Sequence, residues 1–120
     1  MSVRAARRFG GFAEGKGGVA SLPEAVFTDL IPCIDDLDEL KLVLLVLWRL
    51  TKIQAEVAPW ITLPELQADP VVSSALPSQG DASPLAALLA RAVEHGILLR
   101  ADHRLADGAV ESRYFANSPR

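Results

Sequence analysis

Four acidic residues lie close together just ahead of the most apolar stretch of the sequence: Asp35, Asp36, Asp38 and Glu39. Clustered carboxylates can bind a metal ion, but these lack the Asp-x-Asp-x-Asp-Gly loop spacing of a calcium site. Acidic residues are also favourable at the start of a helix, where they accept hydrogen bonds from free backbone N–H groups. We therefore interpret them as capping residues, with Asp35 or Asp36 as the N-cap. If Asp36 is the cap, Glu39 occupies the acidic position of a capping box.

Other residue types that perform chemistry are few. The chain has one cysteine, Cys33, and two histidines, His95 and His103, with no Ser/His/Asp or Cys/His pair at suggestive positions. So few sulfur and nitrogen ligands argue against a zinc site. A single cysteine forms no internal disulfide, which fits a reducing compartment. We expect a cytoplasmic protein that is not an enzyme and has no metal or cofactor.

Basic residues that could contact DNA phosphates are scattered along the chain. Residues 1–16 carry four bases and one acid, residues 24–39 carry six acids and no base, and the net charge is −3. A nucleic-acid-binding domain is usually strongly basic, so DNA contact through this chain alone is expected to be weak. The candidates are Arg4, Arg7, Arg8, Arg91, Arg100, Arg104 and Arg113. Solvated ends and weak surface ion pairs explain the same residues.

The stretch Asp35–Ile53 predicts a central helix on which the other elements pack. No glycine or proline interrupts it, and its charged residues after the first turn lie on one narrow stripe. Leu45 is the single apolar residue on that stripe, whose polar members are Asp38, Lys41, Arg49 and Lys52. A helix that is apolar on almost every other face is buried by its own domain or by a partner. We expect Trp48 to lie deep in the core.

The rest of the chain predicts short elements in a definite order. They are a helix at Leu22–Ile31, a small strand at Trp60–Thr62, a short helix starting near Thr62–Leu66, a further turn at Val71–Leu76, and an amphipathic helix from Pro84 to about His95. Pro32 is expected to end the first helix, because a residue before proline is pushed out of the α region. Residues 1–18 predict an extended or mobile Arg/Gly-rich arm, and residues 19–120 one domain.

The dipeptide Asp107-Gly108 predicts a β-hairpin with a two-residue turn. In that register, Leu99 shares an apolar face with Tyr114, and the opposite face is charged. Two pairs of opposite charge then lie across from each other, namely Arg104 with Glu111 and Asp102 with Arg113. The element order as a whole predicts an α+β, mostly helical winged helix, that is, a helix-turn-helix with a C-terminal β-hairpin wing, preceded by one additional helix.

Four segments carry a resemblance to a known family. They are Phe27–Pro32, Ile34–Lys41, Thr62–Leu66 and Tyr114–Arg120. Over about residues 9–120, the sequence resembles the N-terminal domain of DnaD-like primosomal replication proteins. The resemblance implies a winged-helix oligomerisation scaffold whose extra helix takes part in self-association. It also implies that much of the DNA binding belongs to a separate C-terminal domain, which has no counterpart in this sequence.

Two functions from different classes remain open. The first is a self-association and protein-interaction module in DNA replication initiation and primosome assembly, acting as a homo-oligomer (dimer or tetramer) with replication-initiation proteins as partners. Its predicted interface residues are Phe12, Val26, Phe27, Leu30, Leu45 and Trp60. The alternative is a DNA-binding winged-helix transcriptional regulator. We expect no membrane partner, because the longest apolar run, Leu42–Trp48, is far shorter than the ~20 residues of a spanning helix, and no small-molecule substrate.

Overall fold

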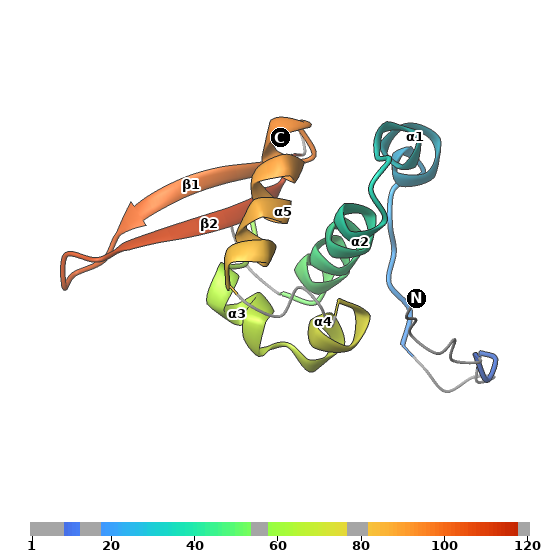
Figure 1. Ribbon diagram of the computed structural model, residues 1–120, viewed down its shortest axis with the longest axis horizontal. Helices are drawn as coiled ribbons and strands as arrows, with labels where there is room; N and C mark the ends of the chain where they lie inside the picture. The colour runs from blue at the N-terminus through green and yellow to red at the C-terminus, as the bar shows by residue number, and fades with distance from the viewer. Residues whose placement is uncertain (1–8, 13–17, 54–57, 77–81, 118–120) are drawn as a thin grey trace, which may run out of the picture.

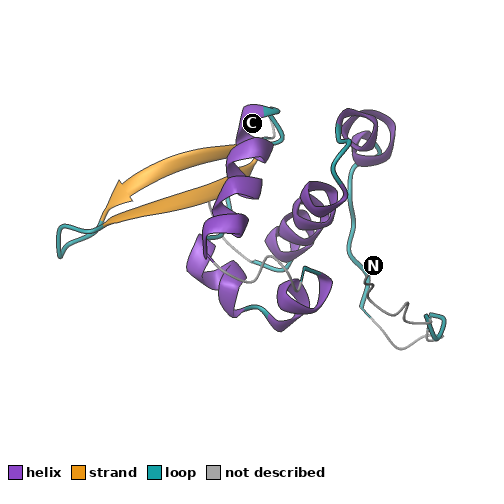
Figure 2. Ribbon diagram, in the orientation of Figure 1, coloured by secondary structure: helices purple, strands orange, loops and turns teal. Residues whose placement is uncertain are grey.

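A computed structural model describes residues 9–12, 18–53, 58–76 and 82–117. The fold is α+β, with helices packed around one another and a two-stranded antiparallel hairpin extending to one side (Figures 1 and 2). In chain order the elements are the π-helical turn η1 (Val26–Leu30), α1 (Ile31–Cys33), α2 (Leu37–Thr51), α3 (Leu63–Ala68), α4 (Pro70–Ala75), α5 (Ala82–Glu94), β1 (Leu98–Arg104) and β2 (Val110–Ala116). No helix in the described ranges is long and apolar enough to cross a membrane.

Helix α2 lies at the centre, as the sequence predicts. Asp36 is its N-cap, and its carboxylate accepts a hydrogen bond from the Glu39 backbone N–H at 2.9 Å. The core side chains of α2 pack against those of α5. The most buried members of this core are Leu42, Val43, Val46, Leu66, Leu85, Leu89 and Leu98. One central helix therefore organises the packing of α4, α5 and the base of the hairpin.

Trp48 is half-buried rather than deep in the core, which corrects the expectation from its apolar surroundings. It lies two residues from both Val46 and Leu50, which is about 200° around the helix axis. Those two residues face the core, so the indole is directed to the other side of α2. There the Arg49 guanidinium lies 4.3 Å from the centre of the indole ring.

The polar stripe of α2 faces other elements of the domain. Lys41 Nζ donates to the Ala75 carbonyl of α4 at 3.3 Å, and Arg49 binds Asp69 between α3 and α4. Leu45 lies between these two contacts on the stripe and is half-buried against the core. Its position among charged residues therefore reflects packing beside α4.

The first helical segment consists of η1 and α1 and continues through Pro32, contrary to the prediction that proline ends it. Ile31 stays in the α region at φ −57° and ψ −43°, and α1 runs on to Cys33. The preceding turn is a π-helix, in which the Ile31 N–H bonds to the Val26 carbonyl. A π turn widens the helix locally, so the proline ring fits without breaking the chain direction.

Short sequence signals define α3 and α4. The Thr62 side chain accepts from the Glu65 N–H, and Glu65 Oε1 accepts from the Thr62 N–H at 2.8 Å, forming a capping box. Asp69 ends α3 and caps α4 through the Val71 N–H at 2.9 Å. Gly96 follows α5 with a φ of +78°, the left-handed conformation predicted for a helix C-terminus.

The hairpin turn lies at the predicted place but has three residues. The Leu105 N–H donates to the Ala109 carbonyl at 2.7 Å, and the Gly108 N–H donates to the Leu105 carbonyl at 3.0 Å. Ala106–Gly108 therefore form the loop, and Gly108 has a φ of +93°. A type I turn followed by a left-handed glycine is the common three-residue hairpin.

The additional turn residue moves the strand register by one, which corrects the predicted cross-strand pairs. Across the strands, Asp102 lies opposite Ser112 and Arg104 opposite Val110. The predicted Asp102–Arg113 and Arg104–Glu111 pairs are therefore not formed. A one-residue slip exchanges the faces of a strand, so Leu98, not Leu99, shares the buried face with Tyr114.

A third segment joins the hairpin at its base. Ile61 forms an antiparallel bridge with Tyr114, with N–H···O distances of 3.0 and 2.9 Å. This bridge lies within the small strand predicted at Trp60–Thr62. It attaches the start of α3 to β2, so the hairpin is fixed to the helices.

Candidate functional site

An apolar groove of about 610 Å³ lies between the first helical segment and the base of the hairpin. One wall is the segment from Ser21 to Leu30, and the floor is the C-terminal half of α2. The other wall is formed by the hairpin base. Its apolar lining includes Leu22, Leu47, Leu50, Ile97, Leu99 and Phe115. A site of this size and apolar character binds another apolar group rather than a charged substrate.

The groove exists because the first helical segment covers α2 incompletely. Val26 is only 5% exposed, and Leu30 packs against the core. On the far side of the segment, Phe27 is 59% exposed. The segment therefore contacts the body through one edge and presents a phenyl ring to solvent on another.

The aromatic wall of the groove is backed by a second ring and a cation. The Trp60 and Phe115 ring centres are 6.2 Å apart, and the Arg113 guanidinium lies 4.2 Å from the centre of the Trp60 ring. Arg113 also binds Glu111 at 3.1 Å. Stacking of this kind holds the rings in place, so the wall at Phe115 is rigid.

The six predicted interface residues lie in different environments. Phe12 and Phe27 are exposed, whereas Leu30, Leu45 and Trp60 are half-buried. Val26 is only 5% exposed, so it offers little surface to a partner. The structure thus brings Val26 and Leu30 to the groove, places Trp60 behind its wall, and leaves Phe27 outside it.

Most of the described arginines predicted to contact DNA are engaged by acids. Arg91 lies 3.7 Å from Asp36, and Arg100 binds Asp102 at 3.0 Å. Arg113 binds Glu111, as above, while Arg104 is exposed and makes no ion pair with another described residue. Three predicted contacts, Arg4, Arg7 and Arg8, lie outside the described residues.

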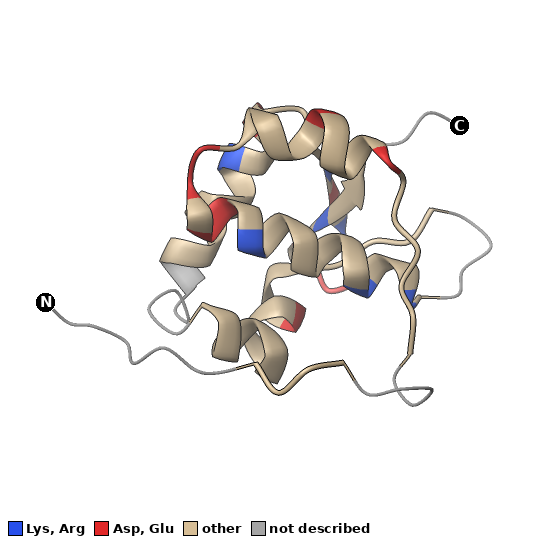
Figure 3. Cartoon of the chain, turned by 90° about the vertical axis from the view of Figure 1, so that its right-hand side faces the viewer, with Lys and Arg blue, Asp and Glu red and all other residues tan. Residues whose placement is uncertain are grey.

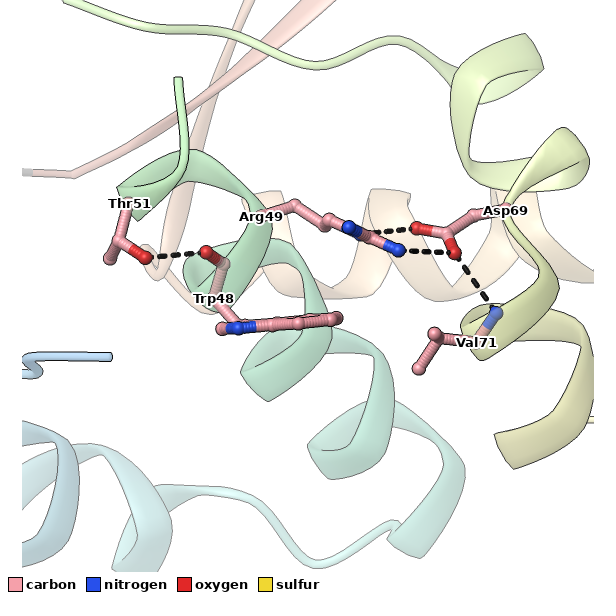
Figure 4. Close-up of polar contacts among 5 residues, drawn as sticks. All are labelled: Trp48, Arg49, Thr51, Asp69 and Val71. Carbon is pink, nitrogen blue, oxygen red and sulfur yellow. Dashed lines mark hydrogen bonds and ion pairs between the residues drawn. The ribbon is translucent and has the colours of Figure 1, made fainter. Parts of the chain in front are cut away.

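An ion pair between a buried carboxylate and a half-buried arginine joins α2 to the α3–α4 junction (Figure 4). Arg49 Nε and Nη2 donate to the two Asp69 carboxylate oxygens at 2.6 and 2.8 Å. The hydrogen bond from Arg49 holds the pKa of Asp69 below its usual range, although burial acts in the opposite direction. The same bond raises the pKa of Arg49. Two parallel bonds of this kind set geometry as well as energy, so this pair positions the helices.

A second buried carboxylate, Glu39, was not expected from the sequence. It is 1% exposed, and its Oε2 lies 2.7 Å from His95 Nδ1 of the turn after α5. Its other oxygen lies 3.9 Å from Arg91 Nε. The Glu39 side chain therefore does not complete the capping box that its spacing suggests. The only feature of the sequence that indicated these contacts was the spacing of Arg91 and His95, which lie four residues apart on one helix face.

These polar clusters do not assemble a metal site within the described part of the chain. There, no group of three or more His, Cys, Asp or Glu side chains is close enough to hold an ion. Cys33 is exposed and free. The acids at the start of α2 contribute a cap through Asp36 and a contact with α5 through Glu39. The groove is therefore the candidate functional site.

Comparisons with protein-family models, with curated proteins and with solved structures gave no match to this chain.

Proposed function

We propose that this chain is the winged-helix domain of a DnaD-like primosomal protein, acting as a non-enzymatic scaffold for self-association in bacterial DNA replication initiation. The observation that carries the proposal is the apolar surface beside the first helical segment. An open apolar groove and the exposed Phe27 lie on the same segment. Exposed apolar surface of this kind is typical of an interaction site.

The order of elements supports a winged helix. Helix α2 is followed by the Ile61 bridge, by α3 and α4, by α5, and by the β1–β2 hairpin. In that arrangement α5 would be the recognition helix and the hairpin the wing. The segment η1–α1 would then be the additional helix of the proposed scaffold.

The charge distribution supports protein contact over DNA contact. The exposed residues on α5 include Ala87, Ala90, Arg91 and Glu94. Base readout needs side chains that donate and accept hydrogen bonds in the groove, and the one arginine among these faces Asp36 and Glu39. The described exposed side chains of α5 therefore do not form a DNA-reading surface.

One observation favours the alternative of a DNA-binding regulator. Arg104 is exposed near the tip of the hairpin, at the end of β1, and makes no ion pair with another described residue. A wing can contact the DNA backbone through such a residue. One free arginine contributes one phosphate contact, so binding through it alone would be weak.

Light scattering at low and high salt tests the proposal. A self-associating domain should show at least twice the 12.9 kDa chain mass, and an apolar interface should persist at high salt. Phe27→Ser should lower the mass, whereas Val110→Ser, at a residue of matched exposure (58% against 59%), should not. A monomer that binds duplex DNA with steep salt dependence would support the regulator instead.

A further inference from the structure

The N-terminal arm carries two aromatic side chains that are exposed to solvent and contact each other. Phe9 is 71% exposed and Phe12 is 93% exposed. Gly11 has a φ of +96°, a conformation open to glycine, and it turns the arm so that the two rings meet. Their centres are 4.8 Å apart at 71°. The arm thus presents a compact apolar pair that is stable in water only at a cost in hydrophobic free energy.

The groove fits such a pair in size and character. Its volume is about 610 Å³, within the range of about 300–1,000 Å³ of ligand pockets. Leu99 and Phe115 on one wall and Leu47 on the floor offer the apolar contacts that phenyl rings prefer. The groove and the arm are therefore both exposed apolar surfaces among the described residues.

The charges around the two surfaces are complementary. Residues 1–16 carry four bases and one acid, whereas residues 24–39 carry six acids and no base. Asp29 lies at the lip of the groove and Glu24 is exposed in the same segment. In Figure 3 this segment carries acidic residues and no basic ones. Opposite charge flanking an apolar contact fixes its orientation and rejects other partners.

The direction of the arm decides which groove it can fill. Gly18 lies beside the Lys52 ammonium group at the end of α2, and residues 9–12 lie away from the helices and the hairpin (Figure 1). We propose that the Phe9–Phe12 arm of one copy inserts into the groove of a second copy, and that the exchange is reciprocal. This inference rests on the proposed self-association and names the contact that produces it.

The first test removes the arm's aromatic side chains from the full chain. Phe9→Ser combined with Phe12→Ser should raise the dissociation constant of the dimer more than about tenfold, because buried aromatics dominate interface energy. Val19→Ser is the control, since Val19 is also exposed (87%) and lies outside the groove lining. An unchanged mass for the arm variant, with Phe27→Ser monomeric, would overturn the exchange and leave the scaffold function standing. A monomeric wild type would overturn both.

The second test separates exchange from docking within one chain. A groove variant, Asp29→Arg with Leu99→Arg, places two cations at the lip and the wall against the basic arm. Its control, Glu94→Arg with Val110→Arg, likewise changes one acid and one apolar residue to arginine, at exposed residues outside both the groove lining and the acidic segment. Circular dichroism should show that all variants fold. The arm variant and the groove variant should each be monomeric alone and form a heterodimer when mixed, because the mixture restores one intact arm and one intact groove. A mixture that stays monomeric would overturn the exchange.

Discussion

The two sides of α2 are covered in opposite ways. On one side, the core residues of α2, α3 and α5 leave almost no exposed surface, as Leu42, Leu66 and Leu89 are 0% exposed. On the other side, the first helical segment buries Val26, packs against the core through Leu30, and leaves an apolar groove open. The difference indicates that one side supplies the stability of the domain and the other its binding surface.

The two sides also differ in how they use charge. The body is held by carboxylates that are themselves buried, Asp69 with Arg49 and Glu39 with His95. The acids of the first segment, such as Asp29, are exposed at the groove. Pairs with a buried carboxylate hold neighbouring helices in one arrangement, whereas exposed charges act on what approaches the surface.

The largest effect on stability should come from a substitution on the closed side of α2, which packs into the core. Leu42→Ala removes a fully buried side chain from the centre of the core and should lower the free energy of unfolding by about 3–4 kcal/mol. Urea denaturation followed by circular dichroism measures this loss. A loss below about 1 kcal/mol would mean that the core is loosely packed, and the contrast between the two sides would disappear.

The next effect tests the ion pair between α2 and the α3–α4 junction. Asp69→Ala should cost about 3 kcal/mol, because it leaves Arg49 without its partner and α4 without its cap. A double-mutant cycle with Arg49→Ala isolates the pair. Additive losses from the two substitutions would show that the pair contributes nothing beyond its separate residues.

The same pair predicts a pH dependence. Because the pKa of Asp69 is lower in the folded chain than in the unfolded chain, its contribution is complete above the ordinary aspartate pKa of about 3.9. It is lost as the pH falls from there through the lower folded pKa. The difference in stability between the wild type and Asp69→Asn should shrink over that acidic range. A difference that stays constant with pH would contradict the assigned shift.

A smaller effect concerns the hairpin, which supplies the far wall of the groove. Gly108→Ala should cost about 1 kcal/mol, because Gly108 has a φ of +93° that a Cβ disfavours. Thermal unfolding measures this, and Gly10→Ala, in the arm with nothing near its Cβ position, is the control. Equal effects at both glycines would argue against the three-residue turn.

The smallest effect on stability should come from the open side. Phe27→Ser should change the free energy of unfolding of the monomer by less than about 0.5 kcal/mol, since the ring is 59% exposed. Measurements at concentrations too dilute for self-association isolate this term. A large loss would place Phe27 in the core of the monomer and remove it from the proposed interface.

Local signals in the sequence were sufficient at several positions where neighbouring residues decide the outcome, although they were wrong at Pro32 and in the length of the hairpin turn. The Asp36 cap, the start of α3 at Thr62, the left-handed Gly96 and the position of the turn at Asp107-Gly108 all follow from side-chain and backbone chemistry within a few residues. The apolar pattern of α2 likewise identified the central helix. The bridge of Ile61 to Tyr114 fits the small strand expected there.

Only the tertiary structure decided features that depend on residues far apart in the chain. Nothing near Glu39 in the sequence indicates that its carboxylate contacts His95, which lies 56 residues later in the turn after α5. Trp48 is half-buried because α2 packs through one side, which its all-round apolar pattern leaves undetermined. The groove depends on how far the first segment lies from the hairpin base. A sequence fixes local conformation through short-range sterics and hydrogen bonds, but distances between elements arise only when all their side chains pack together.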